Sequence, residues 1–443
     1  MELIIELRHL FATVFLGNLG SNLVFPAIAD ITMDSVCPGR RDQCSLAFYL
    51  TAFQQAISGL GAMILTPWIG SLSDKYGRKS MLTFPIVLSI FPHGPKAILA
   101  YKRTTSFFYA YYVMKMLIAM ISHGTLISLA LAYAADKVSA ERRISAFGIV
   151  SGVFMTSFLC GNLAARFLSI AAIFQVAMCL SLIAILYMRI FLEESISIQN
   201  NSLSHPISKM EYGGDGDDDD DFSQLASTTF ETTSSLNQIT SLLRRRSTFS
   251  RTATVYFFHS IALGWTYGSL QFYLKGRFHS NKDQFASLSI IIGGLGAISQ
   301  TIVASSLSAV MGDKKLLSVA LFATFIQMLI LSISWSFWVV YASSSLFLLS
   351  WCVLPAACSI ASKQVESHEQ GKAQGCLSGI QSFAYAISPL VFNPLAALFL
   401  SEDAPFNFPG FTILCLAFTT LMAFVFSLTI KVSHPPISSL EDH

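Results

Sequence analysis

Long apolar stretches follow one another along the whole chain, and each is bounded by charged residues. A helix that spans a membrane needs about 20 mostly apolar residues, so a stretch of that length predicts one such helix. Eight stretches contain no Asp, Glu, Lys or Arg: residues 9–29, 43–73, 144–165, 167–188, 252–274, 284–312, 373–401 and 404–430.

The remaining apolar sequence predicts four more helices. Residues 316–362 are long enough for two, with a turn at Trp335-Ser336-Phe337-Trp338, where aromatic side chains are typical of a membrane interface. Residues 80–101 and 107–134 are each interrupted by a single lysine. The pattern therefore predicts an all-α polytopic membrane protein with twelve transmembrane helices.

A polar segment divides the predicted helices into two sets of six. Residues 193–252 contain the acidic run Asp217–Asp221, many Ser and Thr, and the basic run Arg244–Arg246. Such a composition cannot bury a core, which predicts a disordered linker. The expected organisation is an N-terminal six-helix bundle over 1–192, a disordered cytosolic linker over 193–252, a C-terminal six-helix bundle over 253–430 and a cytosolic tail over 431–443.

The two halves repeat each other faintly at two corresponding places. After the second helix of each half, Ser71-Leu72-Ser73, Gly77 and Lys79 match Ser306-Leu307-Ser308, Gly312 and Lys314. At the start of the fifth helix of each half, Ala146, Gly148, Ser151 and Gly152 match Ala373, Gly375, Ser378 and Gly379. A duplicated six-helix unit explains both matches, and transporters built this way bind solute between the repeats near the bilayer midplane.

The composition excludes the soluble classes of protein. The chain is 53% hydrophobic and 12% charged, with a mean hydropathy of +0.58, whereas soluble domains carry roughly 25% charged residues. With a net charge of only +2, neither a soluble enzyme nor a nucleic-acid-binding protein fits. Lys and Arg are about twice as frequent on the side that holds the N-terminus, so we expect both termini in the cytosol. Plasma membrane and endomembrane both remain open.

The strongest motif is Gly70-Ser-Leu-Ser-Asp74-Lys-Tyr-Gly77-Arg78-Lys79, between the second and third predicted helices. The two glycines permit tight turns and close backbone approach. Asp74 can accept hydrogen bonds from a helix N-terminus or pair with an arginine. The motif closely resembles the signature loop of the major facilitator superfamily, and its copy near Gly312 departs from that pattern. The resemblance covers nearly the whole chain and implies the twelve-helix major facilitator fold.

A second stretch narrows the resemblance. Tyr133-Ala-Ala-Asp136, Glu141-Arg142-Arg143 and Ala146-Phe-Gly148 are similar to the loop between the fourth and fifth helices of the tetracycline-resistance-type branch, near which hippocampus-abundant-transcript-like proteins belong. By this resemblance Asp74 and Asp136, with Arg142 or Arg143, would form a latch on the cytosolic side. It would be made in the outward-facing state and broken when the protein opens inward. Gly70, Gly77 and Arg78 of the signature loop are further gating candidates.

Two departures from the drug-antiporter pattern weaken the case for proton antiport. The fifth predicted helix has Gly161-Asn162 where that branch has a Gly-Pro pair, and the first helix has Asn18 and Asn22 where an Asp is frequent. No acidic residue lies deep inside any predicted helix.

Six polar residues inside the predicted helices are candidate solute contacts. Ionisable groups within a membrane are functional candidates by default, and the resemblance implies that the first, fourth, seventh and tenth helices line the cavity. The candidates are Asn18, Asn22, Lys115, His123, His259 and Tyr267.

Each candidate also has a structural interpretation. Lys115 could attract an anionic group or extend to the membrane interface. His123 could carry a proton, although a hydrogen-bonded core histidine is the commoner case, and the same core role is favoured for His259. Asn18 and Asn22 could bridge helices, a contact that contributes roughly 0.6 kcal/mol.

Cys37 and Cys44 flank a short polar segment in the first predicted outer loop, where an oxidising environment favours a disulfide. No His or third Cys is nearby, so a metal site is not predicted. The sequence contains no phosphate-binding loop, Ser-His-Asp set or HExxH motif. We therefore expect neither an enzyme nor a cofactor.

These features predict a secondary active transporter of a small organic solute, related to the tetracycline and drug antiporters, that works by alternating access. Proton coupling is left open by the residues. The expected partners are the solute, protons if coupling exists, and the lipid bilayer, with the protein as a monomer and no nucleic acid. The alternative is a non-transporting member of the family that acts in trafficking or sensing through residues 193–252.

Overall fold

The structure, a computed structural model, describes residues 2–36, 45–99, 105–122, 124–195, 247–278, 280, 282–400 and 404–430, and every regular element within them is a helix. The first half forms α1 (Glu2–Val36), α2 (Ser45–Tyr76), α3 (Arg78–Leu99), α4 (Thr105–Ser122), α5 (Thr125–Lys137), α6 (Arg143–Ala165) and α7 (Ile170–Phe191). The second half forms α9 (Ser247–Phe278), α10 (Lys282–Ile298), η1 (Ser299–Val303), α11 (Ala304–Met311), α12 (Asp313–Ser332), α13 (Phe337–Ser344), α14 (Phe347–Ser350), α15 (Val353–Ser362), η2 (Ser367–Glu369), α16 (Gln370–Leu400) and α17 (Phe411–Leu428).

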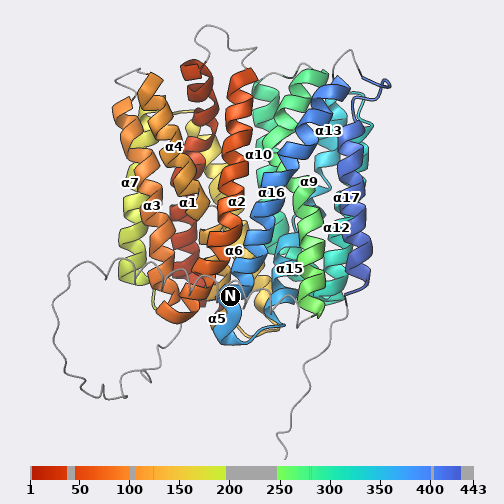
Figure 1. Ribbon diagram of the computed structural model, residues 1–443. Helices are drawn as coiled ribbons and strands as arrows, with labels where there is room; N and C mark the ends of the chain where they lie inside the picture. The colour runs from red at the N-terminus through yellow and green to blue at the C-terminus, as the bar shows by residue number, and fades with distance from the viewer. Residues whose placement is uncertain are drawn as a thin grey trace, which may run out of the picture.

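The helices form two side-by-side bundles that run along a common direction (Figure 1). Elements α1–α7 lie on one side and α9–α17 on the other. Each predicted span corresponds to a single helix or to consecutive helical pieces. The prediction of two helices within 316–362 is confirmed, because α12 ends at Ser332 and α13 begins at Phe337.

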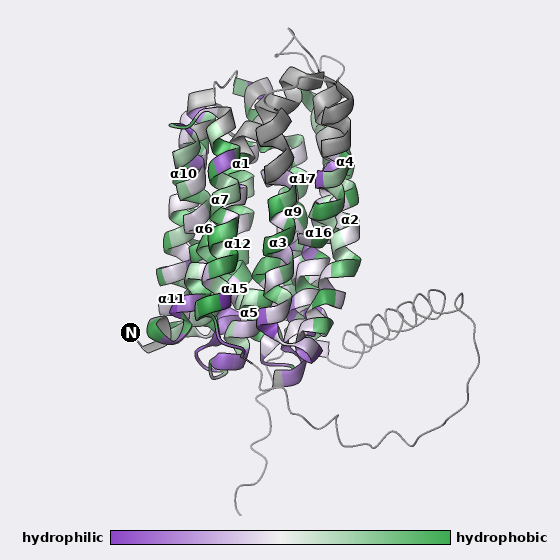
Figure 2. Cartoon of the chain, turned by 90° about the vertical axis from the view of Figure 1, so that its left-hand side faces the viewer, coloured by the Kyte–Doolittle hydropathy of each residue, from purple (hydrophilic) through white to green (hydrophobic). Residues whose placement is uncertain are grey.

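Nine spans within the described residues are long and apolar enough to cross a membrane. The other three, α1, α3 and α9, are helices of 35, 22 and 32 residues. Hydrophilic residues gather at the end of the molecule where α5, α11 and α15 lie (Figure 2). We call this end the motif face, because it carries the loop around Gly77. The all-α membrane architecture predicted from the apolar stretches is confirmed.

Helices α2 and α16 hold the two halves together through glycines. A Cβ atom on Gly59 of α2 would lie 2.6 Å from the Ser382 carbonyl oxygen of α16. On the other side, a Cβ on Gly375 would lie 2.9 Å from both the Thr66 carbonyl oxygen and the Pro67 Cα. Only glycine permits backbones to approach this closely, as in other small-residue contacts between membrane helices.

A second contact between the halves joins α6 to the π-helix η1. Gly148 faces the Gln300 carbonyl oxygen and Gly152 faces Thr301, and in each case a side chain on the glycine would overlap its neighbour. The small-residue pair in the fifth span thus packs against the eighth span of the other half.

Three spans have irregular backbone in their interior. The fourth is divided into α4 and α5 next to Gly124, whose φ of +76° is unfavourable for other residues. The eighth contains the π-helix η1, and the tenth consists of α13, α14 and α15. Irregular backbone at membrane depth is tolerated where it is enclosed by protein or lines a cavity. The breaks in these three spans are therefore expected to be enclosed by neighbouring helices or to line a cavity.

Several sequence predictions lie outside the described residues. These are the disulfide between Cys37 and Cys44, His123, residues 196–246 of the linker and the tail 431–443. Helix α9 begins at Ser247, so helical structure includes the last residues of the segment expected as linker.

We predict that Gly375→Ala lowers the melting temperature of the purified protein. The added methyl group would press on backbone atoms of α2, and overpacking of this kind costs about 1–3 kcal/mol. Thermal unfolding in detergent provides the measurement. Gly294→Ala is the matched control, because no atom lies within 4 Å of its added Cβ. Equal melting temperatures for the two variants would contradict the close α2–α16 contact.

Candidate functional site

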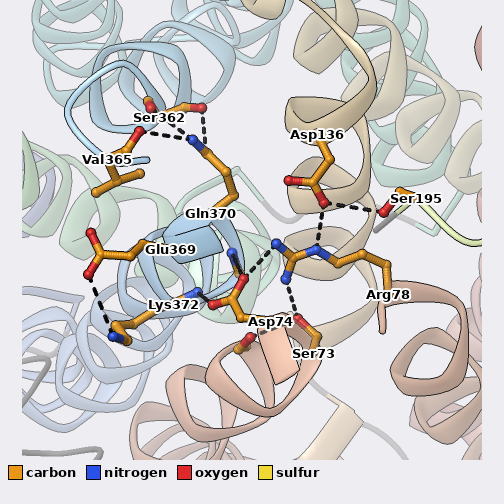
Figure 3. Close-up of polar contacts among 12 residues, drawn as sticks. Ser73, Asp74, Arg78, Asp136, Ser195, Ser362, Val365, Glu369, Gln370 and Lys372 are labelled. Carbon is orange, nitrogen blue, oxygen red and sulfur yellow. Dashed lines mark hydrogen bonds and ion pairs between the residues drawn. The ribbon is translucent and has the colours of Figure 1, made fainter. Parts of the chain in front are cut away.

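The guanidinium of Arg78 is the centre of a charged cluster at the motif face (Figure 3). Gly77, with a φ of +94°, makes the turn between α2 and α3 and places Arg78 at the first position of α3. The side chain is fully buried, with Nη2 2.6 Å from Asp74 Oδ1 and Nε 2.8 Å from Asp136 Oδ2. Its Nη1 donates to Ser73 Oγ at 2.6 Å. We call Ser73, Asp74, Arg78 and Asp136 the Arg78 cluster.

Asp74 connects this cluster to the other half of the protein. Its Oδ1 accepts a hydrogen bond from the backbone N–H of Gly371 and its Oδ2 accepts one from Lys372, both at 2.9 Å. These residues form the first turn of α16, where N–H groups lack partners within the helix and the helix dipole favours a negative charge. A carboxylate on α2 therefore binds the N-terminus of α16.

Gly70 and Gly371 allow this contact to form. Each would place a Cβ against the other's backbone, and a Cβ on Gly371 would also overlap Arg78 Nη1 and lie 2.6 Å from Ser73 Oγ. The glycines of the signature loop and of α16 thus leave the space that the buried arginine occupies.

Glu194 and Ser195, which follow α7, complete the site from the linker side. Glu194 Oε1 accepts a hydrogen bond from the Arg78 backbone N–H at 2.6 Å, and both its oxygens accept from the Lys79 N–H at 3.2 Å. Ser195 Oγ donates to Asp136 Oδ2 at 3.2 Å. Sequence reasoning missed both residues. The sequence signal that could have indicated them is the acidic pair Glu193-Glu194, which comes soon after the sixth predicted helix.

Arg78 is the residue in contact with both Asp74 and Asp136, whereas the family resemblance assigned that role to Arg142 or Arg143. Arg142 is exposed at the start of α6. Arg143 is buried and donates from Nη1 to the Ser362 carbonyl oxygen at 3.0 Å. Because Ser362 ends α15, Arg143 makes a second polar contact between the halves, separate from Asp74.

The first-span candidates have partners within their own half. Asn18 Nδ2 donates to the Val14 carbonyl oxygen one turn earlier, at 2.9 Å. Asn22 Nδ2 donates to Ser157 Oγ of α6 at 3.0 Å. The Asn22 contact joins α1 to α6, as the helix-bridging interpretation expects, whereas the Asn18 contact stays within α1.

Lys115 lies partly buried in α4. It is about 200° around the helix from Val113 and from Leu117, counting 100° per residue, and both of these apolar side chains are exposed. The lysine is therefore on the side of α4 opposite to them.

Tyr267 belongs to a cluster of aromatic side chains contributed by three spans. Its ring centroid lies 5.9 Å from that of Trp351, which follows α14, and 6.2 Å from that of Tyr385 in α16. Gln381 Nε2 donates to the Tyr385 hydroxyl at 3.2 Å. Tyr267 is 44% exposed, so the cluster has an open side. Sequence reasoning missed Trp351, Tyr385 and Gln381, because aromatic residues are too frequent in this chain to single out any of them.

His259 lies about two helical turns before Tyr267 in the same helix. It is almost fully buried in α9, and its Nδ1 has no hydrogen-bond partner among the described residues. Within the same residues, no group of three or more His, Cys, Asp or Glu is arranged to bind a metal. The described cysteines, from Cys160 to Cys415, are free thiols.

The family model of the Major Facilitator Superfamily matches residues 10–389. The chain is 23% identical to mouse Hippocampus abundant transcript-like protein 1 over 365 residues, which covers 81% of this chain and 66% of the mouse protein. It is 22% identical to the Escherichia coli Tetracycline resistance protein, class C, over 395 residues, with 88% and 89% of the two chains covered. The chain thus spans about two thirds of the mouse relative and most of the bacterial one.

Solved structures show the same fold. The human organic anion transporter MFSD10 superposes with a TM-score of 0.74 at 18% identity and covers 95% of this chain and 98% of its own. The proton:xylose symporter XylE, bound to 6-bromo-6-deoxy-D-glucose, superposes with a TM-score of 0.69 at 16% identity, covering 97% and 96%. The twelve-helix fold predicted from the signature loop is confirmed.

We predict that Arg78→Met strongly destabilises the protein. The substitution leaves the two largely buried carboxylates of Asp74 and Asp136 without their cation, and breaking a buried ion pair in this way costs about 3–5 kcal/mol. The yield of folded protein and its melting temperature measure the effect. Lys75→Met, which changes an exposed lysine of the same loop, is the control. A melting temperature for Arg78→Met equal to that of the control would exclude a central role for Arg78.

Proposed function

We infer that this chain, which belongs to the Major Facilitator Superfamily, is a secondary transporter that moves a small organic solute by alternating access. The motif face would be cytosolic, in agreement with the excess of Lys and Arg on that side, and both termini would lie in the cytosol. The protein would act as a monomer in a plasma membrane or endomembrane. No cofactor is required, because the two halves only have to change their relative orientation.

The observation that carries this proposal is the position of Asp74 between the halves. The same carboxylate pairs with Arg78 and accepts hydrogen bonds from the start of α16. Hydrogen bonds to a charged group contribute roughly 1.5–3 kcal/mol, similar to the few kcal/mol that separate two conformations of one protein. The contact is therefore strong enough to favour the conformation closed at the motif face and weak enough to be broken in each cycle.

The solute would bind between the halves at the level of the irregular spans. On the second half, the open side of the Tyr267 cluster offers aromatic surfaces and the Tyr385 hydroxyl. On the first half, Lys115 and the side-chain amides of Asn18 and Asn22 are the candidate contacts. The neighbours named for an organic anion and for xylose make organic anions and sugars the first solutes to test.

The two departures from the drug-antiporter pattern, Gly161-Asn162 and the uncharged first span, favour the alternative of a non-transporting family member. The same contacts between the halves could serve a sensor, but the intact Arg78 cluster is what a rocking mechanism requires. Flux assays therefore decide between the two functions.

We predict that the protein reconstituted in vesicles takes up at least one solute from a panel of organic anions, sugars and drug-like compounds. Asp74→Asn should lower that flux about ten-fold, because it removes a charge-assisted contact of roughly 1.5–3 kcal/mol. Lys75→Gln, beside it and exposed, should transport like the wild-type protein. Wild-type protein that moves none of the panel would refute transport, and normal flux in Asp74→Asn would refute the role of Asp74.

Proton coupling is the second part of the proposal. His259 is the candidate to test in the described second half, because it is a buried titratable residue of α9 whose Nδ1 has no partner among the described residues. If coupling exists, a pH gradient across the vesicle should drive solute accumulation, and His259→Gln should abolish the accumulation while exchange without a gradient remains. Equal uptake with and without the gradient would indicate an uncoupled transporter.

A further inference from the structure

The second half contains a copy of the Arg78–Asp136 ion pair in which the two charges are exchanged. The duplication noted in the sequence places Arg78 and Asp313 at corresponding positions, each directly after a glycine that makes the turn. Those glycines, Gly77 and Gly312, have φ values of +94° and +78°. The alignment of the fifth and eleventh spans likewise places Lys363 at the position of Asp136. The basic residue of one half thus corresponds to the acidic residue of the other, at both positions.

Two contacts correspond between the pairs, the ion pair itself and a hydrogen bond to a serine. Lys363 Nζ lies 2.7 Å from Asp313 Oδ2, as Arg78 Nε lies 2.8 Å from Asp136 Oδ2. Ser308 Oγ donates to Asp313 Oδ1 at 2.7 Å, and the corresponding Ser73 accepts from Arg78 at 2.6 Å. A serine hydroxyl can donate or accept, so the same serine serves a carboxylate in one half and a guanidinium in the other.

The first pair is connected to the opposite half through Asp74, whereas the second pair has no such connection among the described residues. Asp313 binds Ser308 of α11, Ser359 of α15 and Lys363, all within the second half. The residue that corresponds to Asp74 is Ala309, which cannot bind a helix N-terminus. The Asp313–Lys363 pair therefore does not have to open when the two halves separate.

Near Lys363, the contact between the two halves is made by Arg143. It depends on the position of the last residue of α15, Ser362. Arg143 donates to the carbonyl oxygen of Ser362, the residue next to Lys363. Gln370 donates to the same carbonyl at 3.1 Å, and Ser362 Oγ donates to Gln370 Oε1 at 2.6 Å. The end of α15 is thus held by Lys363 towards α12 and by Gln370 towards α16, and this places the acceptor for Arg143.

We propose that Asp313 and Lys363 are positioning residues of the alternating-access cycle. They brace α15 against the start of α12 throughout the cycle, so that the Ser362 carbonyl oxygen meets Arg143 each time the motif face closes. That the brace serves a transport cycle rests on the proposed function. The brace itself is a property of the conformational equilibrium and can be measured without a solute.

The experiment measures the distance between the halves at the motif face in full-length protein in lipid nanodiscs. Spin labels are attached at Ser139→Cys and Glu366→Cys, two exposed positions on opposite halves. Cys37, Cys44, Cys160 and Cys179 are replaced by serine. Pulsed electron spin resonance then gives the ratio of short to long distances, which reports the closed and open populations.

Reversal of one charge, by Asp313→Lys or Lys363→Asp, should lower the closed-to-open ratio by about five-fold, the upper range for a partly exposed pair. The double variant D313K/K363D recreates the charge order of the first half and should restore the ratio to within about two-fold of wild type. An unchanged ratio in the single variants, or a double variant as shifted as the singles, overturns the proposal.

Two further variants separate this role from general effects. Asp313→Asn keeps an oxygen for the serine hydroxyls but loses the charge, so it should also lower the ratio, and it decides the question if the charge reversals fail to fold. Glu369→Gln removes the 3.8 Å pair with Lys372 at the same face and should leave the ratio unchanged. An equal shift in Glu369→Gln would overturn the proposal. Absence of flux in the wild-type protein would refute transport but would not alter these distances.

Discussion

The buried guanidinium of Arg78 is the interaction on which the arrangement of the motif face depends. A cation without access to water requires charged partners, and Asp74 and Asp136 provide them from α2 and α5. Their carboxylates are in turn held by the start of α16 and by Ser195. One desolvated charge therefore determines how α2, α3 and α5 meet, and where the second half touches the first.

Corresponding positions in the two halves form an ion pair with the charges exchanged. In the first half the cation is at the start of α3 and the carboxylate at the end of α5, whereas in the second half the carboxylate is at the start of α12 and the cation at the end of α15. Attraction between the two positions is unchanged by the exchange. What differs is that Asp74 extends the first pair across to the other half, while Ala309 leaves the second pair internal. In the proposed cycle, this asymmetry would open the contact of Asp74 with α16 while the Asp313–Lys363 pair stays intact.

The membrane itself restricts where such features can occur. Backbone N–H and C=O groups cannot remain unpaired in lipid, so most of each span is regular helix. The breaks at Gly124, in η1 and between α13 and α15 occur in the fourth, eighth and tenth spans. Two of these spans also supply contacts of the proposed solute site, Lys115 and Trp351. Glycines in α2, α6 and α16 bring the halves together around this region.

The sequence by itself determined the number and extent of the spans, as the turn between Ser332 and Phe337 illustrates, because the length of an apolar stretch is a local property. It also singled out Asp74 and Asp136 as gating candidates and Tyr267 as a candidate solute contact. Only the tertiary structure decided which cation meets the carboxylates, since Arg78, Arg142 and Arg143 carry the same charge and their partners depend on how α3, α5 and α6 pack. The contacts of Tyr385 and Lys363 are equally non-local: each joins residues far apart in the chain, and nothing in the neighbouring sequence specifies them.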